Sequence, residues 1–321
     1  MIQPLPKFHF PTEDIRLNVL MRQEDKLEAV KSASCDIVPK KVHDVYGDLY
    51  LPEPGEDRPY TFASIVLSSD GKIAFPDDPR GPLIAGNNML DREGGKADFW
   101  VLNMLRAYSD ACLIGARTLQ AEPEGTSHVF CEELAAARTN EMHKSSEHPI
   151  NCIVSFDGTD IPLDHRLFAG DIPVMIGTSP EGGAYLKANM QRPILCLGPY
   201  AKKQDVNMIA IREALAAQPE ALPVFMTGNG KSPDSAALLY ILRQLGVKKL
   251  CVEAPSYMWH LIDNRAMDEM FINYSMVFVG GTVSMGSYKA FSAVDHPHSE
   301  IVSLAMHKTG FIFTRQRLRY L

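Results

Sequence analysis

Five short polar segments each follow an apolar run and have the residue types to hold an anionic ligand. They are 68–72 (Ser-Ser-Asp-Gly-Lys), 115–118 (Gly-Ala-Arg-Thr), 177–179 (Gly-Thr-Ser), 227–230 (Thr-Gly-Asn-Gly) and 253–257 (Glu-Ala-Pro-Ser-Tyr). Small residues and hydroxyls at a helix start leave backbone N–H groups free for an oxyanion, and the helix dipole favours negative charge there. Arg117 adds a bidentate donor that suits a phosphate. Together these segments predict a site for a phosphate-bearing ligand.

Each segment taken alone also fits ordinary turn and capping chemistry. Gly, Ser and Thr are common at helix starts, and Asp70 with Gly71 can simply build a turn. The chain has neither a G-x-x-x-x-G-K-[ST] loop nor a G-x-G-x-x-G directly after a first strand. Neither a P-loop nor a standard Rossmann site is therefore indicated.

Short apolar runs separated by helix-length segments predict the elements that position these turns. Strands are expected at 60–67, 111–114, 152–154, 174–176, 194–197, 224–226, 250–252, 271–279 and 311–313, and helices near 15–34, 96–107 and 233–245. For the last helix, Ser232 can cap the start and Gly246 can close the end in a left-handed conformation. Alternation of helices with fully apolar strands predicts an α/β fold with a mainly parallel sheet covered on both faces. In such a sheet, ligands bind at the carboxyl ends of the strands.

The regular pattern begins near residue 58. Residues 1–57 are polar and irregular, with 52–57 typical of a linker, and we expect an N-terminal extension of unknown role that could wrap a neighbouring subunit. Residues 58–321 are expected to form one domain. The apolar run 270–279 fits either a homodimer seam or a covered central strand.

Charge and composition exclude several classes of partner. Thirty-two basic against thirty-nine acidic residues give a net charge of −7, which disfavours nucleic acid and anionic membrane surfaces. We read no signal peptide and no membrane span. Six scattered cysteines without a C-x-x-C pair fit a reducing, cytoplasmic location. The H-x-E triplet at 298–300 lacks further zinc ligands, so no metal site is expected.

Several motifs in this order resemble the C-terminal reductase domain of the riboflavin-biosynthesis protein RibD. The likeness begins with Arg58-Pro-Tyr, an apolar run, Ser-Ser-Asp-Gly-Lys-Ile-Ala at 68–74 and Ser-Asp-Ala-Cys-Leu-Ile-Gly-Ala-Arg-Thr at 109–118. It continues through 154–157, 161–163, 245–253, 267–269, Gly280-Gly281 and the closing strand at 315–320. About four-fifths of the chain is covered. The resemblance implies a dihydrofolate-reductase-like fold.

The resemblance also implies an NADPH-dependent reductase, commonly a homodimer, that acts on a pyrimidine- or pterin-like small molecule. The cofactor pyrophosphate would lie near 115–118 and 254–257, and the adenosine 2′-phosphate near 177–179. Glu253 would donate a proton, or orient an imine nitrogen, if its surroundings raise its pKa. The expected residues are Gly115, Arg117, Thr118, Thr178, Ser179, Gly228, Ala254, Pro255, Ser256 and Tyr257 for cofactor, Ser69, Asp70 and Lys72 for substrate, and Asp70 and Glu253 for catalysis.

The chain departs from the family pattern mainly in the substrate half. Ser64 replaces the usual lysine of the first strand, and the usual acidic pair, proline and arginine are reduced to Glu122-Pro123. Glu253-Ala-Pro-Ser replaces Glu-Gly-Gly-Pro, and we predict a cis Ala254–Pro255 bond that keeps the same turn. Two alternatives stay open: a reductase of the same fold with an unrelated substrate, and a non-catalytic nucleotide-binding protein.

Overall fold

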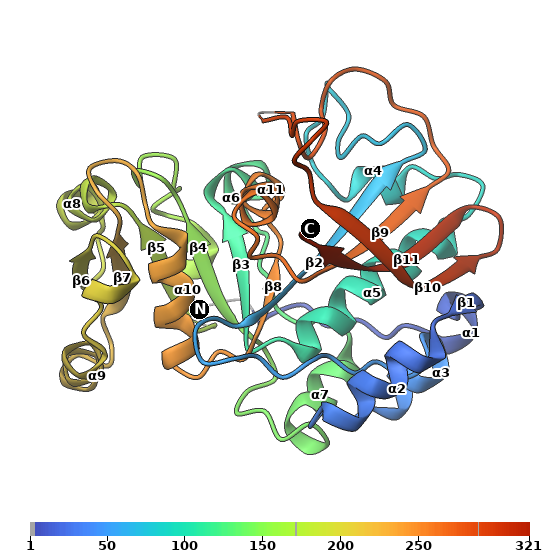
Figure 1. Ribbon diagram of the computed structural model, residues 1–321, viewed down its shortest axis with the longest axis horizontal. Coiled ribbons are helices and arrows are strands. Elements are labelled where there is room, and N and C mark those ends of the chain that lie inside the picture. The colour runs from blue at the N-terminus through green and yellow to red at the C-terminus, as the bar shows by residue number, and fades with distance from the viewer. Residues whose placement is uncertain (1–3, 171, 288) are drawn as a thin grey trace.

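The computed structural model describes residues 4–170, 172–287 and 289–321 and contains one 11-stranded sheet in the order β1-β10-β11-β9-β2-β8-β3-β4-β5-β7-β6 (Figure 1). The strands are β1 Asn18–Arg22, β2 Tyr60–Ser68, β3 Ala111–Gly115, β4 Ile150–Val154, β5 Val174–Thr178, β6 Ile194–Tyr200, β7 Leu222–Thr227, β8 Lys249–Val252, β9 Glu269–Ser275, β10 His298–His307 and β11 Phe311–Arg319. Neighbours are parallel from β9 through β6, whereas β11, β10 and β1 continue the sheet in antiparallel pairing.

Helices cover both faces, as the sequence predicts. They are α1 Thr12–Ile15, α2 Glu24–Ala33, α3 Lys40–Val45, α4 Leu83–Gly86, α5 Arg92–Tyr108, α6 Ala116–Ala121, α7 Glu132–Asn140, α8 Pro180–Asn189, α9 Met208–Ala217, α10 Ser235–Gln244 and α11 Pro255–Asp263. Side chains of α5 and α7 share a core with Phe62 and Cys251, whereas α10 and α11 share one with their sequence neighbours Ala63 and Val252. Since successive strand residues point to opposite faces, α5 and α11 lie on opposite sides of the sheet.

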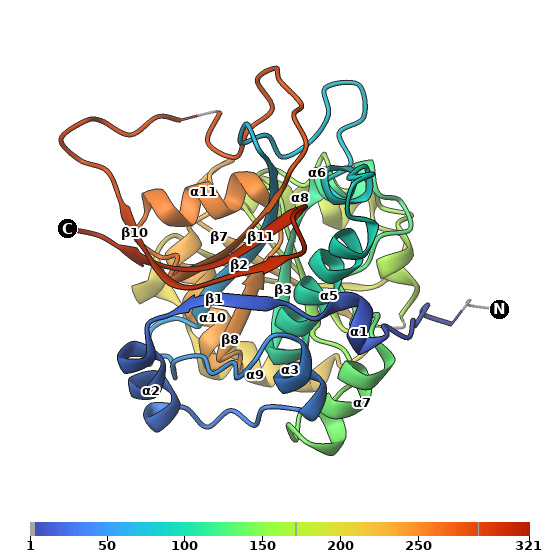
Figure 2. The same ribbon diagram turned by 90° about the vertical axis from the view of Figure 1, so that its right-hand side faces the viewer.

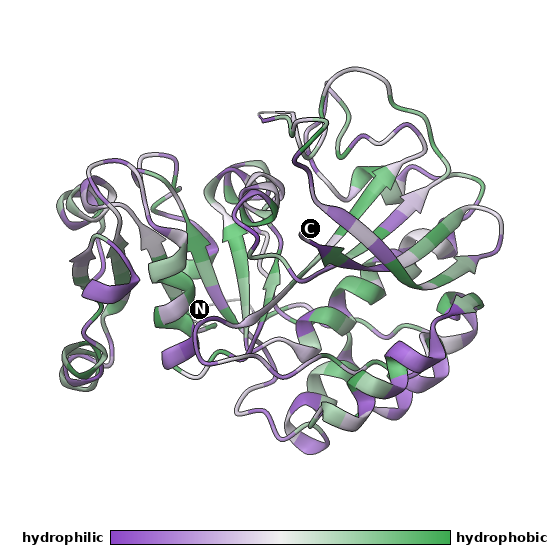
Figure 3. Ribbon diagram, in the orientation of Figure 1, coloured by the Kyte–Doolittle hydropathy of each residue, from purple (hydrophilic) through white to green (hydrophobic). Residues whose placement is uncertain are grey.

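The short parallel strands form where their apolar runs predict, because both of their faces are covered (Figure 3). The helix at α10 is also confirmed, although Asp234 rather than Ser232 caps it by accepting a hydrogen bond from the Ala237 N–H at 2.6 Å. Gly246 follows that helix with φ of +99°, the expected left-handed conformation.

The prediction of a helix near 15–34 is wrong in its first half. The chain there forms α1, then β1, and only then α2. β1 pairs with β10 at the edge of the sheet, for example Asn18 with Met306 (Figure 2). A five-residue strand that depends on a partner so far along the chain has little local signal.

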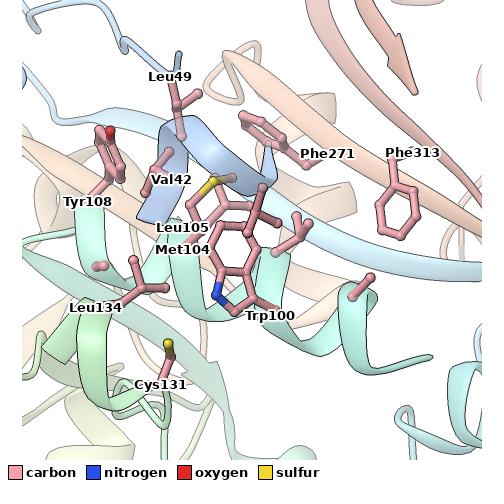
Figure 4. Close-up of a cluster of buried hydrophobic side chains, with 14 of the residues drawn as sticks. Val42, Leu49, Trp100, Met104, Leu105, Tyr108, Cys131, Leu134, Phe271 and Phe313 are labelled. Atoms are coloured by element: carbon pink, nitrogen blue, oxygen red, sulfur yellow. The ribbon is translucent and has the colours of Figure 1, made fainter. Parts of the chain in front are cut away.

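The segment before residue 58 packs on the rest of the chain. Val42, Leu49 and Leu51 are fully buried in the cluster that contains Trp100 of α5 (Figure 4). The His307 ring lies 2.8 Å from the Asp14 carbonyl oxygen, and Arg315 donates to the Tyr50 carbonyl at 2.9 Å. The segment therefore shares the core and the sheet of residues 58–321.

The apolar run 270–279 is a covered interior strand over its first part. β9 ends at Ser275 and has β11 on one side and β2 on the other. It therefore has no free edge with which to pair a second copy, so of the two interpretations the structure favours the central strand.

Candidate functional site

Three of the five predicted turns follow adjacent strands. Sheet order places β8 between β2 and β3, and all three are parallel. The segments 68–72, 253–257 and 115–118 therefore emerge at one edge of the sheet. The segments after β5 and β7 emerge at the same edge, but β4 separates them from β3, so they begin about 10 Å or more farther along.

The sheet opens next to β2 above the end of β8. Residues 60–63 of β2 pair with β8, whereas 64–68 pair only with β9 on the other side. β8 ends at Val252, and β2 continues toward α4 (Figure 1). Among the described residues, the backbone of β2 from Ser64 to Leu67 thus has no strand partner on the side beside Glu253, whereas the Ser68 N–H donates to the Lys72 carbonyl at 2.9 Å. We call this stretch the open edge of β2.

Glu253 lies at the base of this opening and is held by Arg106 of α5. The Arg106 Nε donates to Glu253 Oε1 at 2.8 Å, and its Nη2 donates to Oε2 at 2.7 Å. The Ser127 hydroxyl donates to Oε2 at 2.7 Å. Burial raises the pKa of Glu253, but the charge of Arg106 and the hydrogen bonds from Arg106 and Ser127 outweigh it and hold this pKa below its usual value.

The condition for Glu253 to donate a proton, a pKa raised by its surroundings, is therefore not met. A bidentate partner occupies both carboxylate oxygens, so Glu253 is ionised at neutral pH and is not poised to donate a proton. Its other sequence-based role, orienting an imine nitrogen, depends on the same raised pKa.

The turns after β3 and β8 lie against each other. A Cβ added at Gly115 would lie 3.2 Å from the Ala254 Cβ, so a larger residue at 115 would press on this contact. Pro255 begins α11, and Ala254 precedes it in extended conformation. The Ala254–Pro255 bond is trans, so the prediction of a cis bond is wrong. Proline at the first helical position fits without it, because its fixed φ suits a helix start.

Arg117 and Thr118 lie in the first turn of α6, next to this contact. The Arg117 side chain is exposed and has no hydrogen-bond or ion-pair partner among the described residues. Ser256 of α11 is also exposed. The Tyr257 hydroxyl donates to the Ser235 Oγ at 3.0 Å, and Ser235 in turn lies 2.8 Å from the His260 ring. Arg117 and the start of α11 are thus the accessible donors here.

Thr178, Ser179 and Gly228 have structural roles in this fold. Both hydroxyl residues are fully buried. The Ser179 Oγ caps α8 by accepting from the Gly182 N–H at 3.1 Å, and the Thr178 hydroxyl donates to the Phe156 carbonyl at 3.3 Å. Gly228 has φ of +75°, and its N–H donates to the Tyr200 carbonyl at 2.8 Å. The geometry therefore favours structural roles for these three residues over contacts to a 2′-phosphate.

Asp70 joins two loops above β2. Its Oδ1 accepts from the Ser68 hydroxyl at 2.6 Å and the Val279 N–H at 3.0 Å, and its Oδ2 accepts from the Gly280 N–H at 2.7 Å. These hydrogen bonds, with that from Ser68 the largest contribution, lower the pKa of Asp70 to about 2. Lys72 has no side-chain partner among the described residues. Asp70 therefore links the turn after β2 to the loop at 279–280, and we call this set of hydrogen bonds the Asp70 clamp. Lys72 and the exposed Ser69 are the side chains of this turn that remain accessible to a ligand.

We expect Asp70→Ala to loosen the loop that contains Val279. Hydrogen exchange at the amides of Val279 and Gly280 should speed up roughly tenfold or more, since each loses its acceptor. Because the pKa of Asp70 is depressed, the clamp contributes above the unfolded pKa of about 4 and is lost only as pH falls through about 2. Asp77→Ala, in the same exposed loop, is the control. Unchanged exchange in D70A would refute the clamp.

The sequence analysis did not identify three residues of the site as functional. Arg106 and Asp98 lie inside the predicted helix 96–107, where only the apolar spacing was informative. Ser127 lies in a loop with no motif. The signal that could have found Arg106 is an arginine within the apolar end of a helix, since such a charge needs a buried partner. Glu122, noted only as a remnant of the acidic pair, has its pKa raised by burial near Arg106 and Glu253.

Cys112 and Cys251 face each other on β3 and β8, and their sulfur atoms and a Glu253 oxygen all lie within 4.8 Å. Burial, with a hydrogen bond to Cys251, raises the pKa of the Cys112 thiol well above its usual value. Arg106 already binds both oxygens of Glu253. A protonated thiol and a neutralised carboxylate are poor ligands, so this cluster does not fit a metal ion.

None of the described helices is long and apolar enough to cross a membrane. In sequence comparisons, the RibD C-terminal domain family model matches residues 59–308. The 2,5-diamino-6-ribosylamino-4(3H)-pyrimidinone 5′-phosphate reductase of Archaeoglobus fulgidus is 25% identical over 225 residues, which cover 70% of this chain and 83% of that protein.

Solved structures share the fold. The pyrimidine reductase-like protein of Corynebacterium diphtheriae matches with a TM-score of 0.56 at 16% identity, over 87% of this chain and 98% of that chain. The Thermotoga maritima deaminase/reductase matches with a TM-score of 0.51 at 16% identity, over 81% of this chain and 56% of that chain. This chain thus spans less than two thirds of the Thermotoga protein. Because the family model matches most of the chain, the protein belongs to the RibD C-terminal domain family and has its dihydrofolate-reductase-like fold.

Proposed function

We propose that this protein is an NADPH-dependent reductase of a pyrimidine-like small molecule. The observation that carries the proposal is the convergence of the turns after β2, β8 and β3 on the open edge of β2, with Glu253 at its base. The Archaeoglobus relative, a reductase of a ribosylaminopyrimidinone phosphate, supports the same reaction class.

The residues present fit the pyrophosphate of such a cofactor. The first turn of α11 places backbone N–H groups at the positive end of a helix of nine residues. Gly115 keeps the turn after β3 close to Ala254. When bound, NADPH supplies the hydride, and the chain's task is to hold the acceptor carbon against it. We assign Arg117 rather than Thr178 and Ser179 to the 2′-phosphate, since both hydroxyls are buried.

On the substrate side, Ser69 and Lys72 are the accessible groups of the turn after β2. Glu253, whose oxygens accept from Arg106 and Ser127, fixes the base of the site on this side. Ser64 supplies no charge on the open edge, where the family has lysine. That difference favours the second candidate, a reductase of the same fold whose substrate is unrelated.

NADPH should bind saturably and stabilise the fold. At 100 times its dissociation constant, a ligand that binds only the folded state adds about 2.7 kcal/mol to the free energy of unfolding. Arg117→Ala should weaken NADPH binding roughly tenfold or more, because a charge-assisted hydrogen bond is lost. NADH binding should change less if Arg117 contacts the 2′-phosphate. Fluorescence titration measures the binding of both nucleotides. If neither NADPH nor NADH bound, both reductase candidates would be excluded.

Turnover separates the two reductase candidates. NADPH oxidation is followed with the diamino-ribosylaminopyrimidinone phosphate of the Archaeoglobus reaction and with its deaminated counterpart. Oxidation with either supports the pyrimidine substrate, whereas tight NADPH binding without turnover favours the unrelated one. We also propose that the protein is a homodimer, and light scattering tests this directly. The two copies would not pair through an edge of β9, because β11 and β2 occupy both of its edges.

A further inference from the structure

Asp98 is a carboxyl group with a single hydrogen-bond partner among the described residues. It lies in the second turn of α5, and the Asn273 side-chain amide donates to its Oδ1 at 2.8 Å. Asn273 is itself 1% exposed, so this contact is fixed by the sheet. Among the described residues, Asp98 forms no ion pair, and its second oxygen, Oδ2, is neither bonded nor sealed from solvent.

Asp98 lies over the stretch of β9 that pairs with the upper part of β2. Asn273 of β9 pairs with Val66, which lies within the stretch of β2 that β8 leaves uncovered. Asp98 is about 12 Å along α5 from Arg106, toward the carboxyl ends of the strands. Eight residues is a little over two helical turns, so both side chains leave α5 on the sheet side, Arg106 toward Glu253 and Asp98 toward Asn273.

The charges around Asp98 leave it uncompensated. Burial raises the pKa of Asp98 to about 6, and the hydrogen bond from Asn273 only partly opposes this shift. On β9, Glu269 is paired with Arg315, and β2 and α4 carry no charged residue. On α5, the charged residues are Arg92, Glu93, Lys96 and Arg106, and none of them contributes to the shift.

The carboxyl groups of the site therefore divide into two kinds. Asp70 and Glu253 are locked as acceptors by hydrogen bonds and an ion pair, and their pKa values are lowered. Asp98 has one oxygen fixed and one accessible, which is the arrangement that a proton donor requires. A reductase of this kind needs such a donor, because hydride alone leaves a negative charge on the acceptor.

Resting on the reductase function proposed above, we propose that Asp98 is a catalytic residue that protonates the substrate as hydride arrives. The reacting group is a C=N bond between a pyrimidine amino nitrogen and the sugar carbon. Hydride adds to carbon, the C=N π pair moves to nitrogen, and nitrogen takes the proton from Asp98. The substrate is reduced, the nicotinamide is oxidised, and Asp98 is left as a carboxylate that solvent reprotonates.

The first test reads the proton directly and needs no turnover. In the apo protein, carbon NMR or infrared titration of the Asp98 carboxyl should give a midpoint near 6, and the signal should be missing in Asp98→Asn. A midpoint below 5 would overturn the proposal. Glu93→Gln, on the same helix but paired with Lys308 at 3.1 Å, is the matched control and should leave the Asp98 signal unchanged.

The second test is kinetic. Asp98→Asn keeps an acceptor for Asn273, so it should fold and bind NADPH as before, while kcat falls roughly 100-fold or more. In the parent, kcat should decline as pH rises through the Asp98 midpoint, and this decline should vanish in D98N but persist in E93Q. If D98N kept full kcat, or if kcat fell in Glu122→Gln but not in D98N, the role of Asp98 would be overturned. Either result would leave the reductase function intact. If the parent protein oxidised no NADPH although the Asp98 carboxyl titrated near 6, the reductase function would be rejected. Proton donation by Asp98 to a substrate would be rejected with it.

Discussion

A chain that begins at Arg58 is expected not to fold. Ile15, Val42, Val45, Leu49 and Leu51 are at most 2% exposed and belong to the same core as α5. Fully burying each such side chain contributes about 1.5–3 kcal/mol, so their loss removes roughly 8–15 kcal/mol. That is comparable with the whole stability of a typical domain, about 5–15 kcal/mol. The loss of β1 would also uncover the β10 edge of the sheet.

Soluble yield and thermal melting of residues 58–321, compared with the full chain, measure this effect. Leu20→Ser in β1 is the matched control, because that side chain is 52% exposed and should change stability little. If residues 58–321 melted cooperatively near the temperature of the full chain, the division into an extension and a separate domain at residue 58 would hold, and the shared core would contribute little.

The parallel part of the fold could be predicted because its signal is local. β3 is wholly apolar, β4 and β8 each carry a single polar residue among apolar ones, and a capped amphipathic helix such as α10 is complete within its own sequence. Of the antiparallel part, the sequence predicts only β11, through the strand at 311–313 and the closing strand at 315–320. β1 and β10 were missed because β10 mixes polar and apolar residues, and each gains its strand conformation from a distant partner.

For the site, the sequence predicts where a ligand could bind better than what each side chain does. Turns at strand ends are positioned by the sheet order, so Gly115, Ala254 and Glu253 come together as expected. The state of Glu253 depends on Arg106, which arrives from a helix 147 positions earlier, and no local pattern encodes that pair. Ser179 shows the converse, since a hydroxyl suited to phosphate is equally suited to a helix cap.

Arg106→Met should destabilise the protein by about 3–5 kcal/mol, because it leaves the buried carboxylate of Glu253 without its partner. The Arg106 Nη1 also donates to the His128 carbonyl at 3.0 Å, so a second buried group loses its donor. Arg80→Met is the control, since Arg80 pairs with Asp78 at the surface, where solvent screens the pair, and its loss should change stability little. Urea denaturation at pH 7.5 measures both variants.

The pH dependence of this loss identifies its cause. With Arg106 present, the lowered pKa of Glu253 stabilises the fold above the unfolded value of about 4.3, and that stabilisation is lost as pH falls through the folded pKa. Without Arg106, burial, the largest influence on Glu253, is opposed only by hydrogen bonds such as that from Ser127, so its pKa should rise and R106M should recover stability on acidification. Adding Glu253→Gln to R106M should restore part of the stability at pH 7.5, since the unpaired charge is gone. A loss in R106M that is independent of pH and unrelieved by Glu253→Gln would assign the cost to packing around α5 instead of to the ion pair.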